Sequence, residues 1–370
     1  MSALGLELEE WRAEARRLQL PAYRGEQVFR ALQHEAAPAW SQIRQLPEGD
    51  RARLAEAHPL HWPGIAQRLQ SSDGTVRYLL RLEDGAEIEA VYLPDEEFDG
   101  EGRRLRRRTT FCISSQAGCA VNCQFCLTAT LGLMRSLTAA EIVAQALLLL
   151  REHDLRPGKG LDRVNLVFMG MGEPFLNYDN VIRAIRVLTQ AEGAAIAPRR
   201  ITVSTSGIVD KIRRWGSEGF PRGRPRLAIS LNASTDDQRQ ALMPLHRPQG
   251  GLAALLQAVR DLPLAPREYV TFEYVLLAGV NDSDADARRV HDLLEGLPSK
   301  LNLIPWNPGP GLGYSAPAPE RVLAFQRILV QAGLPTYVRR PRGRDIYAAC
   351  GQLANRSTGL GPRAPSPVER

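Results

Sequence analysis

The chain has 370 residues, 44% of them hydrophobic, which is enough for one large domain with a small accessory domain and argues against wholesale disorder. Its net charge of +6 and isoelectric point near 9.2 favour an anionic partner such as nucleic acid. The N-terminus does not read as a signal peptide, no apolar run reaches membrane-spanning length, and the five cysteines form an odd set. These features predict a cytoplasmic protein whose thiols stay reduced.

Short amphipathic helices are predicted for residues 1–70, as a helical accessory domain. Apolar residues recur there in three groups at helical spacing, which are Leu6, Leu8, Trp11 and Ala15; Val28, Phe29 and Leu32; and Trp40, Ile43 and Leu46. Residues 71–108 predict a β-hairpin, made of VRYLLRL, the turn Glu83–Gly85 and AEIEAVYL, and then a charged loop. That loop, Asp95–Arg108, is first acidic and then strongly basic, which is typical of an exposed segment.

From residue 109 to 350 the pattern alternates between strands and helices. The strand-like segments are TTFCISS, VNLVFMG, RITVST, LAISL, YVTFEYVLL and LNLIPW. Such alternation predicts an α/β fold of right-handed βαβ units around a parallel sheet. About six units predict an incomplete (β/α)6 barrel, because a full eightfold barrel takes roughly 250 residues and two more strands. The segment 351–370, rich in Pro, Gly, Ser and Arg, is predicted to be a disordered tail.

Three cysteines, Cys119, Cys123 and Cys126, follow the first barrel strand in a C-x3-C-x2-C pattern. A structural zinc site takes four ligands, so a distant histidine would have to complete it. Three thiolates can instead hold three irons of a 4Fe–4S cube and leave the fourth iron open. S-adenosylmethionine (SAM) binds such an open iron in radical-SAM chemistry, and the triad resembles the signature of that superfamily.

A glycine-rich turn and several short polar residues follow the predicted barrel strands, at the sheet edge where α/β folds place their ligands. In Gly170–Pro174, glycines allow close backbone approach, and the Glu173 carboxylate can accept hydrogen bonds from the SAM ammonium group. The candidate SAM contacts at these strand ends are Gly172, Glu173, Ser204, Ser230, Leu231, Asn232 and Asn307.

The wider segment FCISSQAGCAVNCQFCLTATLGLMRSLTAAEI resembles the RlmN/Cfr family of radical-SAM RNA adenine methyltransferases, and its RlmN branch most closely. The resemblance runs from about Leu20 to Cys350. It implies methylation of adenine C2 with one 4Fe–4S cluster and two SAM molecules per turnover, and it assigns the seven strand-end residues to the SAM site. Many family members have histidine where this chain has Asn232, so no proton-transfer role is expected there.

The resemblance also implies roles for two further cysteines and a glutamate. Cys350, in DIYAACGQL, matches the cysteine that SAM methylates first, and that then carries the methyl carbon to the base. Cys112 matches the thiol that resolves the protein–RNA link through a transient disulfide with Cys350, so their Cα atoms should approach to about 4.4–6.8 Å. Glu89, in EIEAVYLP, matches the proton acceptor. By residue type alone, the cysteines would be inert and Glu89 a solvated strand residue.

By resemblance, the RNA partners are 23S rRNA, at the peptidyl-transferase centre, and tRNA, at the adenine that follows the anticodon. An electron donor such as flavodoxin or ferredoxin, a monomeric state and no membrane contact are also expected. Basic clusters for phosphate contacts are Arg103–Arg108, Arg199–Arg200 and Arg339–Arg344. Three alternatives stay open, namely Cfr-type methylation of adenine C8, a non-catalytic zinc-stabilised RNA-binding protein, and a radical-SAM enzyme for a protein or small molecule.

Overall fold

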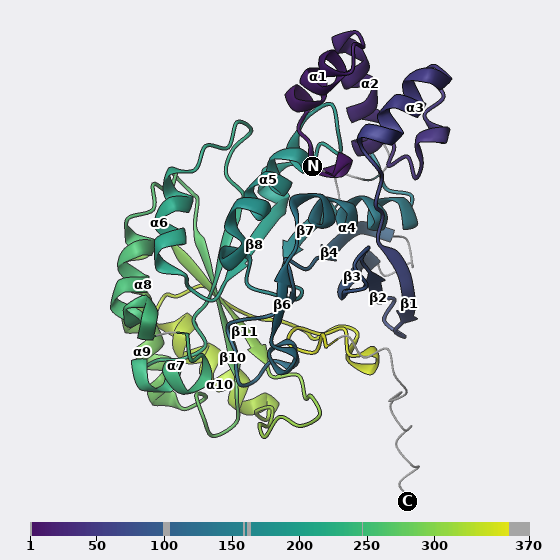
Figure 1. Ribbon diagram of the computed structural model, residues 1–370. Coiled ribbons are helices and arrows are strands. Elements are labelled where there is room, and N and C mark those ends of the chain that lie inside the picture. The colour runs from purple at the N-terminus through teal and green to yellow at the C-terminus, as the bar shows by residue number, and fades with distance from the viewer. Residues whose placement is uncertain (1, 99–103, 158–159, 161–163, 246, 355–370) are drawn as a thin grey trace, which may run out of the picture.

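A ten-stranded sheet runs through the molecule in the order β1-β2-β3-β4-β7-β8-β9-β10-β11-β12 (Figure 1). The computed structural model describes residues 2–98, 104–157, 160, 164–245 and 247–354, so the predicted tail lies almost wholly outside the described residues. The strands are β1 (Gly64–Gln70), β2 (Val76–Arg81), β3 (Glu87–Phe98), β4 (Arg104–Cys112), β7 (Val164–Phe168), β8 (Ile201–Thr205), β9 (Arg226–Ser230), β10 (Val270–Leu276), β11 (Ser299–Pro305) and β12 (Thr336–Val338).

The six predicted barrel strands are confirmed as β4, β7, β8, β9, β10 and β11, which pair in parallel in that order. Helices connect them and cover the outer face of the sheet (Figure 1). They are α4 (Ala139–Glu152), α5 (Tyr178–Thr189), α6 (Val209–Ser217), α7 (Asp236–Leu242), α8 (Gly251–Arg260) and α9 (Asp284–Leu294), with α10 (Pro319–Gln331) after β11. The short strand β12 extends the parallel sheet beyond the prediction, since three residues show no readable alternation.

The N-terminal region contains α1 (Leu8–Arg17), α2 (Ala22–Gln33) and α3 (Glu48–Ala57), which lie together at one end of the sheet (Figure 1). Helices α1 and α2 confirm the first two helices that the apolar spacing predicts. The third prediction is misplaced, because the Trp40 region forms only a short 3-10 turn and the helix begins at Glu48, after its N-cap residue Pro47. Residues 64–70, expected within the helical part, form strand β1 against β2.

The charged stretch predicted as a loop is largely strand, and that expectation was wrong. Strand β3 continues to Phe98, and β4 begins at Arg104. Their antiparallel register sets Asp95 opposite Arg108 and continues with acidic positions opposite basic ones. The acidic block and the basic block therefore lie on two paired strands. Arg103 lies outside the described residues.

One large apolar core joins the N-terminal helices, the hairpin and the barrel. The first described residues pack into it, since Leu4 is fully buried and the turn that contains it contacts α4. A separate small apolar group forms beside the cysteine loop and consists of Val121, Phe125, Leu242, Met243, Leu277 and Trp306. Among the described helices, none combines the length and the apolar character needed to cross a membrane.

Candidate active site

The cysteine loop lies between the short strand β5 (Gln116–Gly118) and the 3-10 turn η3 (Leu127–Leu131). Cys119 N donates to Gly132 O at 2.8 Å, and this hydrogen bond joins the first cysteine of the loop to the residue that follows η3. Burial raises the pKa of the Cys119 thiol to about 12 and that of Cys123 well above its usual value. The charges of the triad add to both shifts. The three thiols therefore lie close enough to repel one another once ionised.

Apolar side chains surround this loop. The three cysteines pack against the small apolar group that includes Phe125, Met243 and Trp306. The Trp306 indole donates from Nε1 to Phe125 O at 2.9 Å and so fixes the loop to the end of β11. Within the described ranges, no three His, Cys, Asp or Glu side chains are arranged to hold a single metal ion.

The glycine-rich turn after β7 packs directly on the backbone that follows β4. A Cβ at Gly170 would lie 2.7 Å from Ile113 O, and one at Gly172 would lie 2.5 Å from Gln116 Cβ. Gly172 also has φ of +95°, a conformation that glycine adopts without strain. Close approach and backbone geometry thus both require these glycines.

Glu173 is buried, and both oxygens of its carboxylate accept backbone hydrogen bonds. Its Oε1 accepts from Phe175 N at 2.9 Å, and its Oε2 accepts from Ser206 N at 2.6 Å. Burial raises the pKa of Glu173 despite these hydrogen bonds. Its charge in turn raises the pKa of Cys119 and Cys123. A cationic group bound beside the cysteines would therefore meet a positioned, poorly solvated carboxylate.

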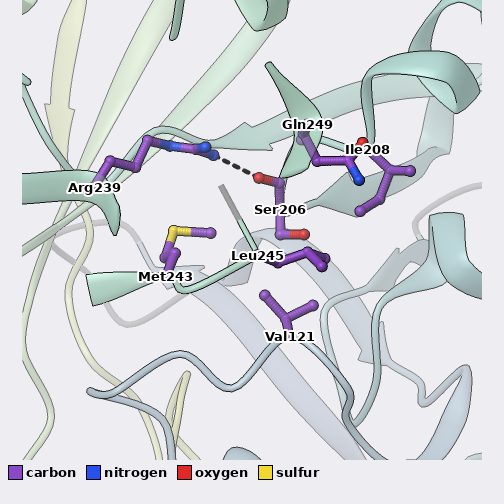
Figure 2. A pocket seen from close by; sticks show the side chains of 8 residues that line it. Val121, Ser206, Ile208, Arg239, Met243, Leu245 and Gln249 are labelled. Atoms are coloured by element: carbon purple, nitrogen blue, oxygen red, sulfur yellow. Dashed lines mark hydrogen bonds between the residues drawn. The ribbon is translucent and has the colours of Figure 1, made fainter. Parts of the chain in front are cut away.

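A small pocket lies between the cysteine loop and the carboxyl ends of β8 and β9 (Figure 2). It is lined by Val121, Ser206, Gly207, Ile208, Arg239, Met243, Leu245 and Gln249. Arg239 crosses its edge and is 1% exposed. Its guanidinium donates to Ser206 O at 2.5 Å and to Leu231 O at 3.0 Å, and burial lowers its pKa to about 10. This one side chain ties the ends of β8 and β9 together.

Cys350 reaches the same region from the C-terminal segment. Its carbonyl accepts from Asn307 Nδ2 at 3.1 Å, and the next residue, Gly351, accepts from Leu127 N at 2.8 Å. Burial raises the pKa of the buried Cys112 thiol, and the charge of Cys350 raises it further. Both are free thiols, so the predicted disulfide is not supported by this structure.

Glu89 lies on β3 and is fully buried, unlike the solvated strand residue that its type alone suggests. Its Oε1 accepts from Arg77 Nε at 3.0 Å and also from Arg77 Nη2. Its backbone carbonyl accepts from Ser114 Oγ at 2.6 Å, beyond the end of β4. The carboxylate is thus held on the side of the sheet that faces the C-terminal segment.

Known proteins match this arrangement. Residues 113–289 match the model of the radical SAM superfamily. A relative from Koribacter versatilis, named "Probable dual-specificity RNA methyltransferase RlmN", is 50% identical over 91% of this chain and 97% of its own. The RlmN of an Anaeromyxobacter species is 46% identical over 93% of this chain and 88% of its own. The chain belongs to the RlmN family. A radical SAM methyltransferase from Sphaerobacter thermophilus has the same fold, with a TM-score of 0.84 and 40% identity, over 96% of this chain and 99% of that one.

As an RlmN-family member, the protein uses a 4Fe–4S cluster and SAM. The donor set fits this cluster, because three mutually repelling thiols on one loop become stable together as ligands of separate irons. Cys119, Cys123 and Cys126 would hold it. Because the chain belongs to this family, the alternative of a non-catalytic zinc-stabilised protein is wrong.

None of the predicted SAM residues is among the residues that line this pocket. Ser204 and Ser230 lie half-buried at the ends of β8 and β9. Asn232 has φ of +56°, and its side chain bonds the backbone of β10, since Oδ1 accepts from Val275 N at 2.9 Å. Asn307 contacts the Cys350 backbone and accepts from Arg344 Nε at 2.9 Å.

Sequence reasoning missed Arg77 and Arg239, the two buried arginines of the site. Arg77 stands in an apolar strand, VRYLLRL, where a charged residue between apolar neighbours could have signalled a buried partner. Arg239 lies in the polar helix α7, so its sequence context carries no comparable signal.

Proposed function

We propose that this chain methylates C2 of an adenine in RNA and that Cys350 carries the methyl carbon. The observation that supports the proposal is that the Cys350 segment is bonded to the cysteine loop, since Gly351 O accepts from Leu127 N, next to Cys126, at 2.8 Å. A methyl carrier has to reach SAM, the substrate base and a second thiol from one position. The relatives from Koribacter versatilis and an Anaeromyxobacter species are named RNA methyltransferases, which favours RNA over a protein or small molecule.

Each site residue then has a chemical task. When bound, the cluster and SAM supply a methyl group and a carbon radical that can remove hydrogen. The Sγ atom of Cys350 would lose its proton and take the methyl group. After one hydrogen atom of that methyl group has passed to the radical, its carbon would bond to adenine C2, and the surplus electron of this adduct would return to the cluster. Glu89 accepts the proton from C2. Cys112 Sγ would lose its proton and bond to Cys350 Sγ while the sulfur–carbon bond breaks, and the carbon left on C2 would take up a proton to become the methyl group. Two electrons from a donor such as flavodoxin or ferredoxin would reduce the resulting disulfide.

SAM itself would be oriented by strand-end groups. Glu173 is placed to accept from the SAM ammonium group, and Gly172 leaves room for close approach. The side chains of Ser204 and Ser230 and the backbone of Leu231 would contact the rest of the molecule, with Asn232 and Asn307 holding the surrounding segments. The pocket residue Ser206 joins this set, because its backbone N already orients Glu173.

The proposed substrates are 23S rRNA, at the peptidyl-transferase centre, and tRNA, at the adenine after the anticodon. Exposed arginines on the Cys350 segment support an anionic substrate. Arg339 and Arg340 are exposed, and the Arg339 charge opposes the rise in the pKa of both Cys112 and Cys350. Arg199 is also exposed, whereas Arg200 bonds Asn165 Oδ1 at 3.2 Å.

The test is anaerobic incubation of the reconstituted enzyme with methyl-labelled SAM and separate rRNA and tRNA transcripts. The wild type should yield 2-methyladenosine. Cys350→Ala should transfer no label to RNA, and Cys112→Ala should accumulate a covalent protein–RNA adduct. Formation of 8-methyladenosine, or label transfer by Cys350→Ala, would contradict the proposal.

A further inference from the structure

A buried ion pair lies in the β2–β3 hairpin, outside the barrel. Arg77 is 5% exposed and Glu89 is 0% exposed, and the guanidinium meets the carboxylate through both Nε and Nη2. The same two strands carry a second pair of the same residue types, Arg81 with Glu87, and its arginine side chain is 60% exposed. A buried pair costs desolvation that an exposed pair avoids, so stability alone gives little reason to place the first pair inside.

The Arg77 guanidinium has a second contact, to the C-terminal segment. Its Nη1 donates to Ile346 O at 2.9 Å, and Ile346 precedes Cys350 by four residues. A guanidinium presents its donors in a rigid planar fork. The group that holds the Glu89 carboxylate therefore also holds the segment that carries Cys350.

The β1–β2 turn attaches to the same segment. Ser71 Oγ donates to Asp345 Oδ1 at 2.6 Å, and Gly343 N donates to Asp73 Oδ2 at 3.0 Å. Arg342 Nε completes this contact at 2.9 Å from Asp73 Oδ2. In Figure 1 the C-terminal segment, in yellow, crosses from the barrel toward this hairpin. These outer contacts are more exposed than the Arg77 contact and do not touch Glu89.

We propose that Arg77 is a positioning residue, which sets the Glu89 carboxylate and the Cys350 segment at a fixed distance from each other. This inference rests on the proposed function, in which Glu89 accepts a proton from the base to which Cys350 is bonded. Both groups must meet one adenine ring at the same time. A displacement of about 1 Å between such groups costs up to about 100-fold in rate.

The experiment compares reconstituted wild type with Arg77→Met, Arg77→Lys and the matched control Arg81→Met. Arg77→Met should lower kcat for RNA methylation by about 10–100-fold, with KM for RNA within about twofold. Hydrogen–deuterium exchange should become faster across residues 342–354. Arg77→Lys keeps a cationic donor and should recover most of kcat, and Arg81→Met should match the wild type in kcat and in exchange. Equal kcat in Arg77→Met and Arg81→Met would overturn the inference, as would unchanged exchange across 342–354.

A second comparison avoids the unpaired Glu89 carboxylate in the core, which could unfold Arg77→Met. The double variant Arg77→Met/Glu89→Gln buries no charge at this site. We expect it to accept the methyl group on Cys350, measured by peptide mass spectrometry without RNA, several-fold more slowly than Glu89→Gln does. Equal rates would show that Arg77 does not position the Cys350 segment. Failure of the proposed function would look different, because the wild type and Arg81→Met would then also leave RNA unmethylated.

Discussion

Asn232 shows how a single residue can serve the fold at the edge of an active site. Its left-handed backbone is tolerated by asparagine better than by most residues, and its Oδ1 caps the backbone of β10. Arg239 likewise donates hydrogen bonds to three backbone carbonyls at the ends of β8 and β9. At this scale, polar side chains that look like ligand contacts also hold the strand ends in place.

Gly172→Ala tests how closely the glycine-rich turn packs against Gln116. Gly85→Ala is the control, because Gly85 also has positive φ, of +83°, but has nothing within 4 Å of an added Cβ. The control should cost about 1–2 kcal/mol of unfolding free energy for backbone strain alone. Gly172→Ala should cost about 1–3 kcal/mol more, because its Cβ would meet Gln116. Urea unfolding of the two variants tests this, and equal losses would show that the turn can move.

Glu173→Gln should change how stability depends on pH. Burial raises the pKa of Glu173 in the folded state, so its contribution to stability is present at low pH and is lost as pH rises through the folded pKa. Glutamine cannot ionise, so the iron-free variant should gain stability relative to the wild type as pH rises above about 4.5, the ordinary pKa of glutamate. SAM binding should weaken in the same variant. If the difference in unfolding free energy between Glu173→Gln and the wild type were the same at every pH, burial would not raise the pKa of Glu173.

At the scale of elements, α4 supports the strand end next to Cys112. Thr138 and Glu141 form a capping box at its start, and Glu141 also binds Arg135 through both Nη atoms. One turn further along, the buried Gln145 accepts from Ser114 N at 2.9 Å and donates to Ser114 O at 3.0 Å. The helix thus replaces the sheet as the hydrogen-bond partner where β4 ends.

Gln145→Leu should therefore destabilise the protein by about 1–3 kcal/mol for each backbone group of Ser114 that it leaves without a partner. Gln257→Leu is the control, because Gln257 is an exposed helix residue that bonds only Asp261 among the described contacts. That variant should lie within about 0.5 kcal/mol of the wild type. Thermal unfolding measures both, and equal midpoints would mean that water or a rearranged backbone replaces Gln145.

At the scale of the whole molecule, the cysteine loop is separate from the main core. The large core spans the N-terminal helices, hairpin and barrel, while the cysteines pack against the small group around Phe125 and Trp306. Leu245 packs against both groups and connects them. The barrel therefore has its own source of stability, which does not depend on what the cysteines bind.

Removal of iron should leave the barrel folded. After anaerobic chelation, far-UV circular dichroism should be retained, and the rise in hydrogen exchange should be confined to residues near 119–131. Reconstitution with iron and sulfide should restore protection there. Cooperative loss of all secondary structure on chelation, as in small zinc domains, would show that the large core is not sufficient.

The sequence by itself determined the repeating architecture and the cysteine loop, because both are encoded locally. Strand and helix periodicity is visible in each barrel unit, and the three cysteines lie within eight consecutive positions. It also located Glu89, Cys112 and Cys350, but only through their resemblance to a family. The tertiary structure alone decided that charged residues 95–98 and 104–108 pair as strands, that Asn232 serves the backbone, and that Arg77 bridges Glu89 to the Cys350 segment. Arg77 and Ile346 are 269 positions apart, and no local pattern reports a contact that only the folded chain brings together.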